Sequence, residues 1–225
     1  GITANPTVGA FSDLLVAQGG SVMLTEVPEM FGAEEALLNR CVDKDVFGRA
    51  VDMINSFKNY FTSHNQVVYE NPSPGNKQGG ITPLEDKSLG CVQKGGTAPV
   101  VDVLQYGEPV RKRGLSLLSA PGNDLVSATA LTASGCHIVL FTTGRGTPFS
   151  APAPTVKISS NNALYEKKAN WIDFNAGTVV EGETIAQAGR RLMDFVKELA
   201  SGERLTKAEE NNYRGIAIFK DGVTL

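Results

Sequence analysis

Short apolar runs typical of buried strands alternate along the chain with helical segments, and this alternation most constrains the fold. The longest helical segments, at about 45–61 and 185–200, have apolar residues at intervals of three and four. The strand-like runs include 22–27, 99–104 and 137–141. Strands separated by helices of ten or more residues pair in parallel through right-handed crossovers. We therefore expect an α/β fold, a three-layer sandwich around a mostly parallel, Rossmann-like sheet.

With 225 residues and 41% apolar content, the chain can bury a full core as a single domain covering 1–225. The remaining expected elements come from the same periodicity. Helices are expected from Asn5 to just before Gly19, at about 33–41, 84–94 and 163–169, and from a cap at Asn123 or Asp124 to about Ser134. Strands are expected at 115–119, 155–158 and 216–219, the last at the edge of the sheet.

Composition excludes several classes of partner. A formal net charge of -3 and the lack of any long Lys/Arg run give no surface suited to nucleic acid or an anionic membrane. No apolar run approaches the roughly 18 residues that a membrane-spanning helix requires. The three cysteines are widely spaced and form no CxxC pair, which is typical of a reducing compartment. We therefore expect a cytoplasmic protein whose ligand is a small molecule.

Two loops rich in glycine and proline are the main candidates for ligand binding. The loop at 71–80 carries Lys77, and the loop at 141–148 follows a predicted strand and carries Arg145 between two glycines. Glycines let a main chain approach a ligand closely, and a single cation beside them suits an anionic group. The alternatives are an ordinary surface loop at 71–80 and a plain turn at Arg145.

The predicted strand at 22–27 ends in the segment 26–29, which places two carboxylates, Glu26 and Glu29, at its carboxyl end. Ligands of open α/β sheets bind at the carboxyl ends of the strands. These side chains could bind a hard divalent cation or exchange protons with a substrate, whereas Glu29 could also simply stabilise a helix N-terminus. The glycine spacings of dinucleotide and nucleoside-triphosphate sites, zinc-ligand spacing and a Gly-x-Ser-x-Gly elbow are absent.

Several longer motifs resemble one known family across essentially the whole chain. They are the segments 1–6, 24–34, 70–77 with 79–81, 87–90, 119–124 and 141–148, and they resemble the C-terminal region of the altronate and galactarate dehydratase family. The resemblance implies a hydro-lyase that converts D-altronate to 2-dehydro-3-deoxy-D-gluconate in hexuronate breakdown. It also implies a divalent metal, Fe²⁺ or Mn²⁺. Galactarate dehydratase is the alternative activity within the same chemistry.

Under this resemblance, the chemistry of the candidate side chains predicts a division of roles. Arg145 and Lys77 would bind the substrate carboxylate, and Glu26 would bind metal or act as acid or base. The hydroxyl-binding residues would be Asn71, Ser73, Asn76, Thr143 and Thr147. Family members carry an N-terminal SAF-like domain and a central region with His and Cys, which this chain lacks, so the chain is expected to be a fragment whose main metal ligands lie elsewhere. We also expect a homo-oligomer, and the second hypothesis is a packing or oligomerisation domain without catalytic groups.

Overall fold

A computed structural model of the chain describes residues 1–68 and 84–222. Within these residues, six strands form two three-stranded sheets, ordered β1-β3-β2 and β4-β5-β6, and every strand pair is parallel. The α/β class and the parallel pairing are thereby confirmed. The strands are divided between two sheets rather than one because helix α6 (Asp124–Ala133), which connects β3 to β4, packs between them.

The first sheet consists of β1 (Ser21–Leu24), β3 (Gly114–Leu118) and β2 (Val100–Leu104), with β3 in the centre and buried along its whole length. One face packs against α3 (Lys44–Ser63), which begins where the Asp43 carboxylate accepts a hydrogen bond from the Val46 amide. The apolar residues that α3 buries are Val46, Ala50, Met53, Ile54 and Phe57. The opposite face packs against α6.

The second sheet consists of β4 (Val139–Thr143), β5 (Thr155–Ser159) and the two-residue strand β6 (Phe174–Asn175). One of its faces packs against α1 (Ala4–Ala17) and α8 (Ile185–Ala200). A capping box at the start of α8 explains its sharp boundary, since the side chains and amides of Thr184 and Gln187 bond reciprocally.

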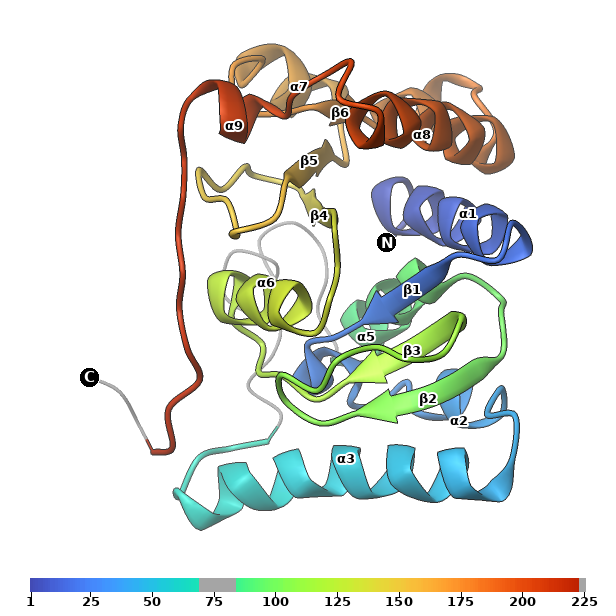
Figure 1. Ribbon diagram of the computed structural model, residues 1–225, viewed down its shortest axis with the longest axis vertical. Helices are drawn as coiled ribbons and strands as arrows, with labels where there is room; N and C mark the ends of the chain where they lie inside the picture. The colour runs from blue at the N-terminus through green and yellow to red at the C-terminus, as the bar shows by residue number, and fades with distance from the viewer. Residues whose placement is uncertain (69–83, 223–225) are drawn as a thin grey trace.

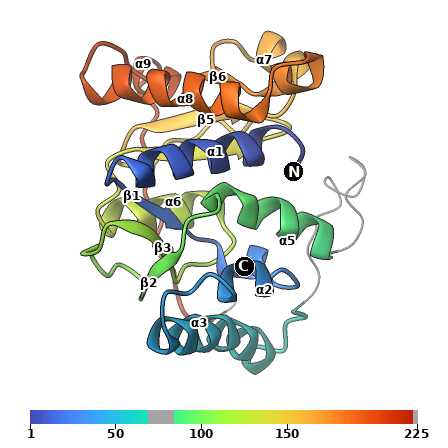
Figure 2. The same cartoon turned by 90° about the vertical axis from the view of Figure 1, so that its right-hand side faces the viewer.

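Helix α1 lies between β1 and α8 in both views of the molecule (Figures 1 and 2). Two glycines allow this close packing. A Cβ at Gly9 would lie 2.2 Å from the Gln93 carbonyl oxygen, and one at Gly189 would lie 2.6 Å from the Ala10 Cβ. Helix α1 therefore contacts both halves of the fold with almost no space to spare.

The remaining elements are short. They are η1 (Val27–Met30), α2 (Glu35–Leu38), α5 (Leu84–Val92), η2 (Gln93–Gly95), α7 (Asn162–Lys167), η3 (Gly177–Glu181) and α9 (Lys207–Glu210). The expected helix at 33–41 is reduced to α2, and the expected strand at 22–27 ends three residues early at Leu24. In the part of the chain that the structure describes, no helix has the length and apolar character needed to cross a bilayer.

The expected edge strand at 216–219 is wrong. This segment is extended, but its amides do not join a sheet: Ala217 donates to the Thr129 hydroxyl and Phe219 to the Tyr106 hydroxyl. Exposure alternates along the segment, since Ile216 and Ile218 are exposed while Ala217 and Phe219 are half-buried against the domain. Side-chain oxygens take the place of a neighbouring strand.

Candidate functional site

Glu26 follows β1 in a left-handed backbone conformation, with φ 66° and ψ 64°. A residue with a Cβ adopts this conformation at a cost of about 1 kcal/mol or more. The conformation ends the strand and begins η1, in which the Glu29 amide donates to the Glu26 carbonyl oxygen. Both carboxylates consequently lie at the carboxyl end of the first sheet.

Helix α5 and the turn after it bring three further groups to Glu29. The ammonium of Lys87 lies 2.6 Å from Glu29 Oε1, and the thiol of Cys91 donates to Glu29 Oε2 at 2.9 Å. The side chains of Lys87 and Glu29 are only 15% and 16% exposed. Lys94 follows in η2, and its charge acts on both Glu26 and Glu29. We call Glu26, Glu29, Lys87, Cys91 and Lys94 the acid–lysine cluster.

The two carboxyl groups of this cluster differ sharply in their affinity for protons. Burial, with the negative charge of Glu29 adding to it, raises the pKa of Glu26 to about 8. Burial also acts to raise the pKa of Glu29, but the charges of Lys94 and Lys87 and the hydrogen bonds from Cys91 and Lys87 outweigh it and hold the pKa below its ordinary value. Glu26 is therefore protonated near neutral pH while Glu29 is ionised, an arrangement typical of an acid–base pair.

Lys94 remains charged despite its burial. Burial alone would lower its pKa, but Cys91 and the carboxylates Glu26, Glu29 and Asp124 together raise the pKa above its ordinary value. The backbone around it is fixed by α1: the Ser12 hydroxyl donates to the Lys94 carbonyl oxygen at 2.8 Å. A fixed positive charge of this kind stabilises negative charge that develops on a neighbouring ligand.

The start of α6 completes this side of the site. Asp124 follows the carboxyl end of β3, and its pKa is raised by burial and by the charge of Glu29. The Ser127 hydroxyl lies 3.4 Å from Glu26 Oε1. Carboxylates from the ends of two neighbouring parallel strands thus meet at one edge of the first sheet.

The Arg145 loop lies at the corresponding end of the second sheet, directly after β4. The Thr143 hydroxyl accepts hydrogen bonds from the amides of Arg145, at 3.3 Å, and Gly146, at 2.9 Å. Gly146 has φ 85°, which suits a residue without a Cβ. Thr143 therefore stabilises the turn that holds Arg145 at the surface, while Thr147 accepts a hydrogen bond from Phe149 through its carbonyl oxygen.

The sequence-based site residues divide into two groups. Glu26, Arg145, Thr143 and Thr147 lie at the carboxyl ends of parallel strands or just beyond them, with Glu26 on the first sheet and the others on the second. Asn71, Ser73, Asn76 and Lys77 fall outside the described residues. The convergence of the two loops and the roles of all these residues stay predictions.

Three residues of the acid–lysine cluster are not among the site residues predicted from sequence: Lys87, Cys91 and Lys94. The signal that could have identified them is their spacing of four and three residues, which places them on one face of a helix. The sequence predicts Asp124 as a helix cap, whereas in the structure it also follows a strand that pairs with β1.

A metal site is not formed by the described residues alone. Among residues 1–68 and 84–222, no group of three or more His, Cys, Asp or Glu side chains is arranged to hold a metal ion. Metal binding by Glu26 stays a prediction.

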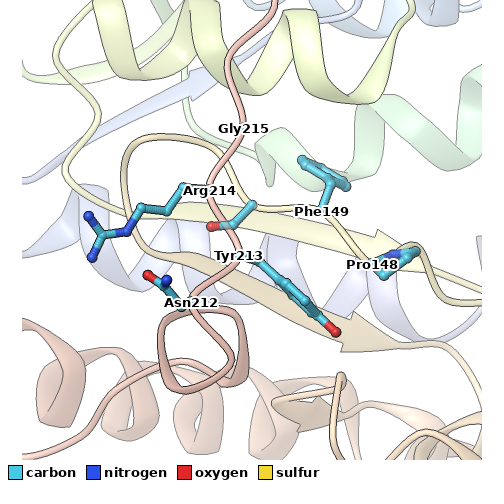
Figure 3. Close-up of a pocket in the computed structure, with 7 residues that line it drawn as sticks. Pro148, Phe149, Asn212, Tyr213, Arg214 and Gly215 are labelled. Atoms are coloured by element: carbon cyan, nitrogen blue, oxygen red, sulfur yellow. The ribbon is translucent and has the colours of Figure 1, made fainter.

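Two shallow cavities lie away from the acid–lysine cluster. The first, of about 290 Å³, is lined by residues 148–150 and 212–215, where the side chains of Tyr213 and Arg214 point to opposite sides of the backbone (Figure 3). The second, of about 470 Å³, includes Arg191 and Arg204, which are paired with Glu183 and Glu198. Neither cavity includes a residue predicted to bind substrate.

Comparison with known proteins agrees with the motif resemblance. The family described as D-galactarate/Altronate dehydratase, C-terminal, matches residues 1–224. The chain is 59% identical over 226 residues to the altronate dehydratase of Bacillus subtilis (strain 168) and 56% identical over 225 residues to that of Escherichia coli (strain K12), covering 100% of this chain and 45% of each relative. It is 39% identical over 212 residues to the galactarate dehydratase (L-threo-forming) of Escherichia coli (strain K12), covering 93% of this chain and 40% of that relative. The chain thus spans less than half the length of these relatives.

Proposed function

Because the chain belongs to the D-galactarate/altronate dehydratase family, as its C-terminal domain, we propose that the protein dehydrates D-altronate to 2-dehydro-3-deoxy-D-gluconate. The higher identity to the two altronate dehydratases, 56% and 59% against 39% for galactarate dehydratase, supports altronate over galactarate. We further propose that the reaction belongs to hexuronate breakdown in the bacterial cytoplasm.

The reaction removes a proton from the carbon next to the substrate carboxylate and a hydroxyl from the following carbon. Proton removal places negative charge on the carboxylate, so a fixed positive charge is needed beside it. The departing hydroxyl must receive a proton to leave as water. The reaction therefore needs positively charged side chains that bind the substrate carboxylate, and a carboxylic acid that keeps its proton at neutral pH.

The single observation that carries the proposal is the opposed protonation of Glu26 and Glu29 beside Lys94. Glu26, with a pKa of about 8, is the group that we assign as proton donor to the leaving hydroxyl. Ionised Glu29, held by Lys87 and Cys91, prevents Glu26 from losing its proton early because a second negative charge would lie beside the first. Lys94 and Arg145 provide positive charge for the substrate carboxylate, and Lys77 remains a predicted second cation.

We also propose that a divalent metal, Fe²⁺ or Mn²⁺, takes part, with ligands from outside the described residues. Such an ion would polarise the substrate carboxylate or hydroxyl as a Lewis acid. A homo-oligomeric state is likewise a proposal.

The decisive experiment measures water loss from D-altronate and from galactarate by a polypeptide of the relatives' full length that contains this chain. Glu26→Gln should lower kcat by about 100-fold or more, the usual contribution of a general acid. The matched control is Glu35→Gln, which removes an exposed carboxylate of α2 and should leave kcat within twofold. Full activity of the variant that combines Glu26→Gln with Lys94→Met would instead favour a packing domain without catalytic groups. Preferential turnover of galactarate over D-altronate would reassign the substrate.

A further inference from the structure

The side chain of Asn5 joins the two halves of the proposed site. It is 8% exposed and lies in the first turn of α1. Its Nδ2 donates to the Gly90 carbonyl oxygen at 2.9 Å, and its Oδ1 accepts from the Thr142 hydroxyl at 2.8 Å. One planar amide therefore makes hydrogen bonds to two elements that belong to different parts of the fold.

Each of these bonds leads to a residue of the proposed site. Gly90 immediately precedes Cys91 in α5, and the Cys91 thiol donates a hydrogen bond to Glu29 within the acid–lysine cluster. Thr142 immediately precedes Thr143, whose hydroxyl holds the turn containing Arg145. Through Asn5, the carboxyl end of β4 is placed at a set position relative to α5.

A second contact, from the N-cap residue of α1, supports this role. The Thr3 hydroxyl donates to the Ser160 carbonyl oxygen at 2.7 Å, directly after β5. The start of α1 is thus bonded to the ends of both long strands of the second sheet. Asn5 alone among these contacts also reaches α5.

We infer that Asn5 is a positioning residue that fixes the distance between the Arg145 loop and the acid–lysine cluster. This inference rests on the proposed function, in which Arg145 binds the substrate carboxylate while the cluster supplies the proton. The two groups must act on adjacent parts of one small molecule, and a displacement of about 1 Å can cost about 100-fold in rate.

The chemistry of the bonds explains why this side chain is an asparagine. The position requires one donor and one acceptor on the same short planar group. Aspartate keeps the acceptor for Thr142 but places a carboxylate oxygen against the Gly90 carbonyl oxygen. Alanine removes both bonds, so the Thr142 hydroxyl and the Gly90 carbonyl oxygen each lose this partner.

The first test measures amide hydrogen exchange in the intact protein. Asn5→Ala and Thr142→Val should each accelerate exchange of the Arg145 and Gly146 amides by about tenfold or more, since each removes the link that holds β4 to α5. The matched control, Thr132→Val, deletes a threonine hydroxyl that bonds only within α6, to the Ala128 carbonyl oxygen. Unchanged exchange at Arg145 and Gly146 in both site variants would overturn the inference.

The second test is a double-mutant cycle on kcat/KM with D-altronate. If Asn5 acts through Arg145, Asn5→Ala should raise KM in the parent protein but have little further effect once Arg145→Ala is present. Strictly additive effects would show that Asn5 only stabilises the fold and would overturn the positioning role. Absence of turnover in the unsubstituted protein would reject the proposed function instead, and the exchange experiment would still decide whether Asn5 couples β4 to α5.

Discussion

The thiol of Cys91 donates a hydrogen bond to Oε2 of Glu29 at 2.9 Å, on the carboxylate whose other oxygen binds Lys87. Burial, together with the charge of Glu29, raises the pKa of Cys91 to about 12, although Lys94 opposes this shift. Cys91 is therefore a neutral hydrogen-bond donor near neutral pH and not a nucleophile.

This relationship predicts an unreactive thiol. Alkylation by iodoacetamide requires the thiolate, so Cys91 in the folded protein should remain unlabelled at pH 7.5 under conditions that label a free cysteine completely. Burial also raises the pKa of Cys136 to about 11, which provides a second slow site for comparison. Peptide mass spectrometry with and without urea measures the labelling, and rapid modification of folded Cys91 would contradict the assigned environment.

The protonated state of Glu26 predicts how stability depends on pH. Its pKa is about 8 in the folded protein and near the ordinary 4.5 when unfolded, so between these values the folded state holds a proton that the unfolded state releases. The free energy of unfolding should fall as pH rises through this window, by at most about 1.4 kcal/mol per pH unit for one proton. Glu26→Gln should flatten the curve measured by urea denaturation from pH 5 to 9. Parallel curves for the two proteins would refute the assignment.

Two glycines predict opposite effects of the same substitution. Gly9→Ala would place a Cβ 2.2 Å from the Gln93 carbonyl oxygen in η2. The substitution should therefore lower the free energy of unfolding by more than about 2 kcal/mol. It should also displace Lys94, which follows Gln93 in η2. Gly48→Ala in α3 meets nothing within 4 Å and should stabilise the protein by up to about 1 kcal/mol. Chemical denaturation of both variants tests the packing of α1, and equal effects would disprove it.

The buried amine of Lys157 predicts a stabilising substitution. Its side chain is fully buried on β5, and within the described residues its Nζ has no hydrogen-bond partner, although it lies 5.5 Å from the ring centre of Phe149 and 6.0 Å from that of Tyr213. Burial lowers the pKa of Lys157, opposed by Asp173. Lys157→Met should raise the free energy of unfolding at pH 7 by about 1 kcal/mol.

The pH dependence of that gain provides its control. The gain in the free energy of unfolding from Lys157→Met should shrink as pH rises toward the ordinary pKa of lysine, because Lys157 then loses its positive charge in both the folded and the unfolded state. Lys44→Met, at an exposed position of α3, should change stability by less than about 0.5 kcal/mol at any pH. A loss of stability in Lys157→Met would mean that the two aromatic rings and Asp173 compensate for burial of the amine.

Local sequence patterns predict the elements whose ends are set by contacts within the same segment. The expected helix at 185–200 has the bounds of α8, because its periodicity coincides with a capping box. The strand at 22–27 was predicted too long, since nothing in the local pattern indicates that a glutamate would take a left-handed conformation. The segment 216–219 was misassigned because its hydrogen-bond partners, Thr129 and Tyr106, are remote in sequence.

The same distinction holds for the site. The placement of Glu26 at a sheet edge follows from strand direction and could be predicted. The protonation of Glu26 could not, because its raised pKa depends on burial in the folded chain and on the charge of Glu29, which the charge of Lys94 only partly opposes. The Lys94 backbone is in turn held by Ser12 from α1. Contacts between segments about 80 residues apart leave no trace in local periodicity.

The position of α1 between the two halves also bears on how the protein is made. Its apolar face is covered by α8, which is synthesised only after about 170 more residues have been added. At typical rates of translation this interval is on the order of ten seconds. During that time Val8 and Phe11 lack the α8 side chains that pack around them in the folded protein, so polar substitutions at these positions should alter the yield of folded protein as well as its stability.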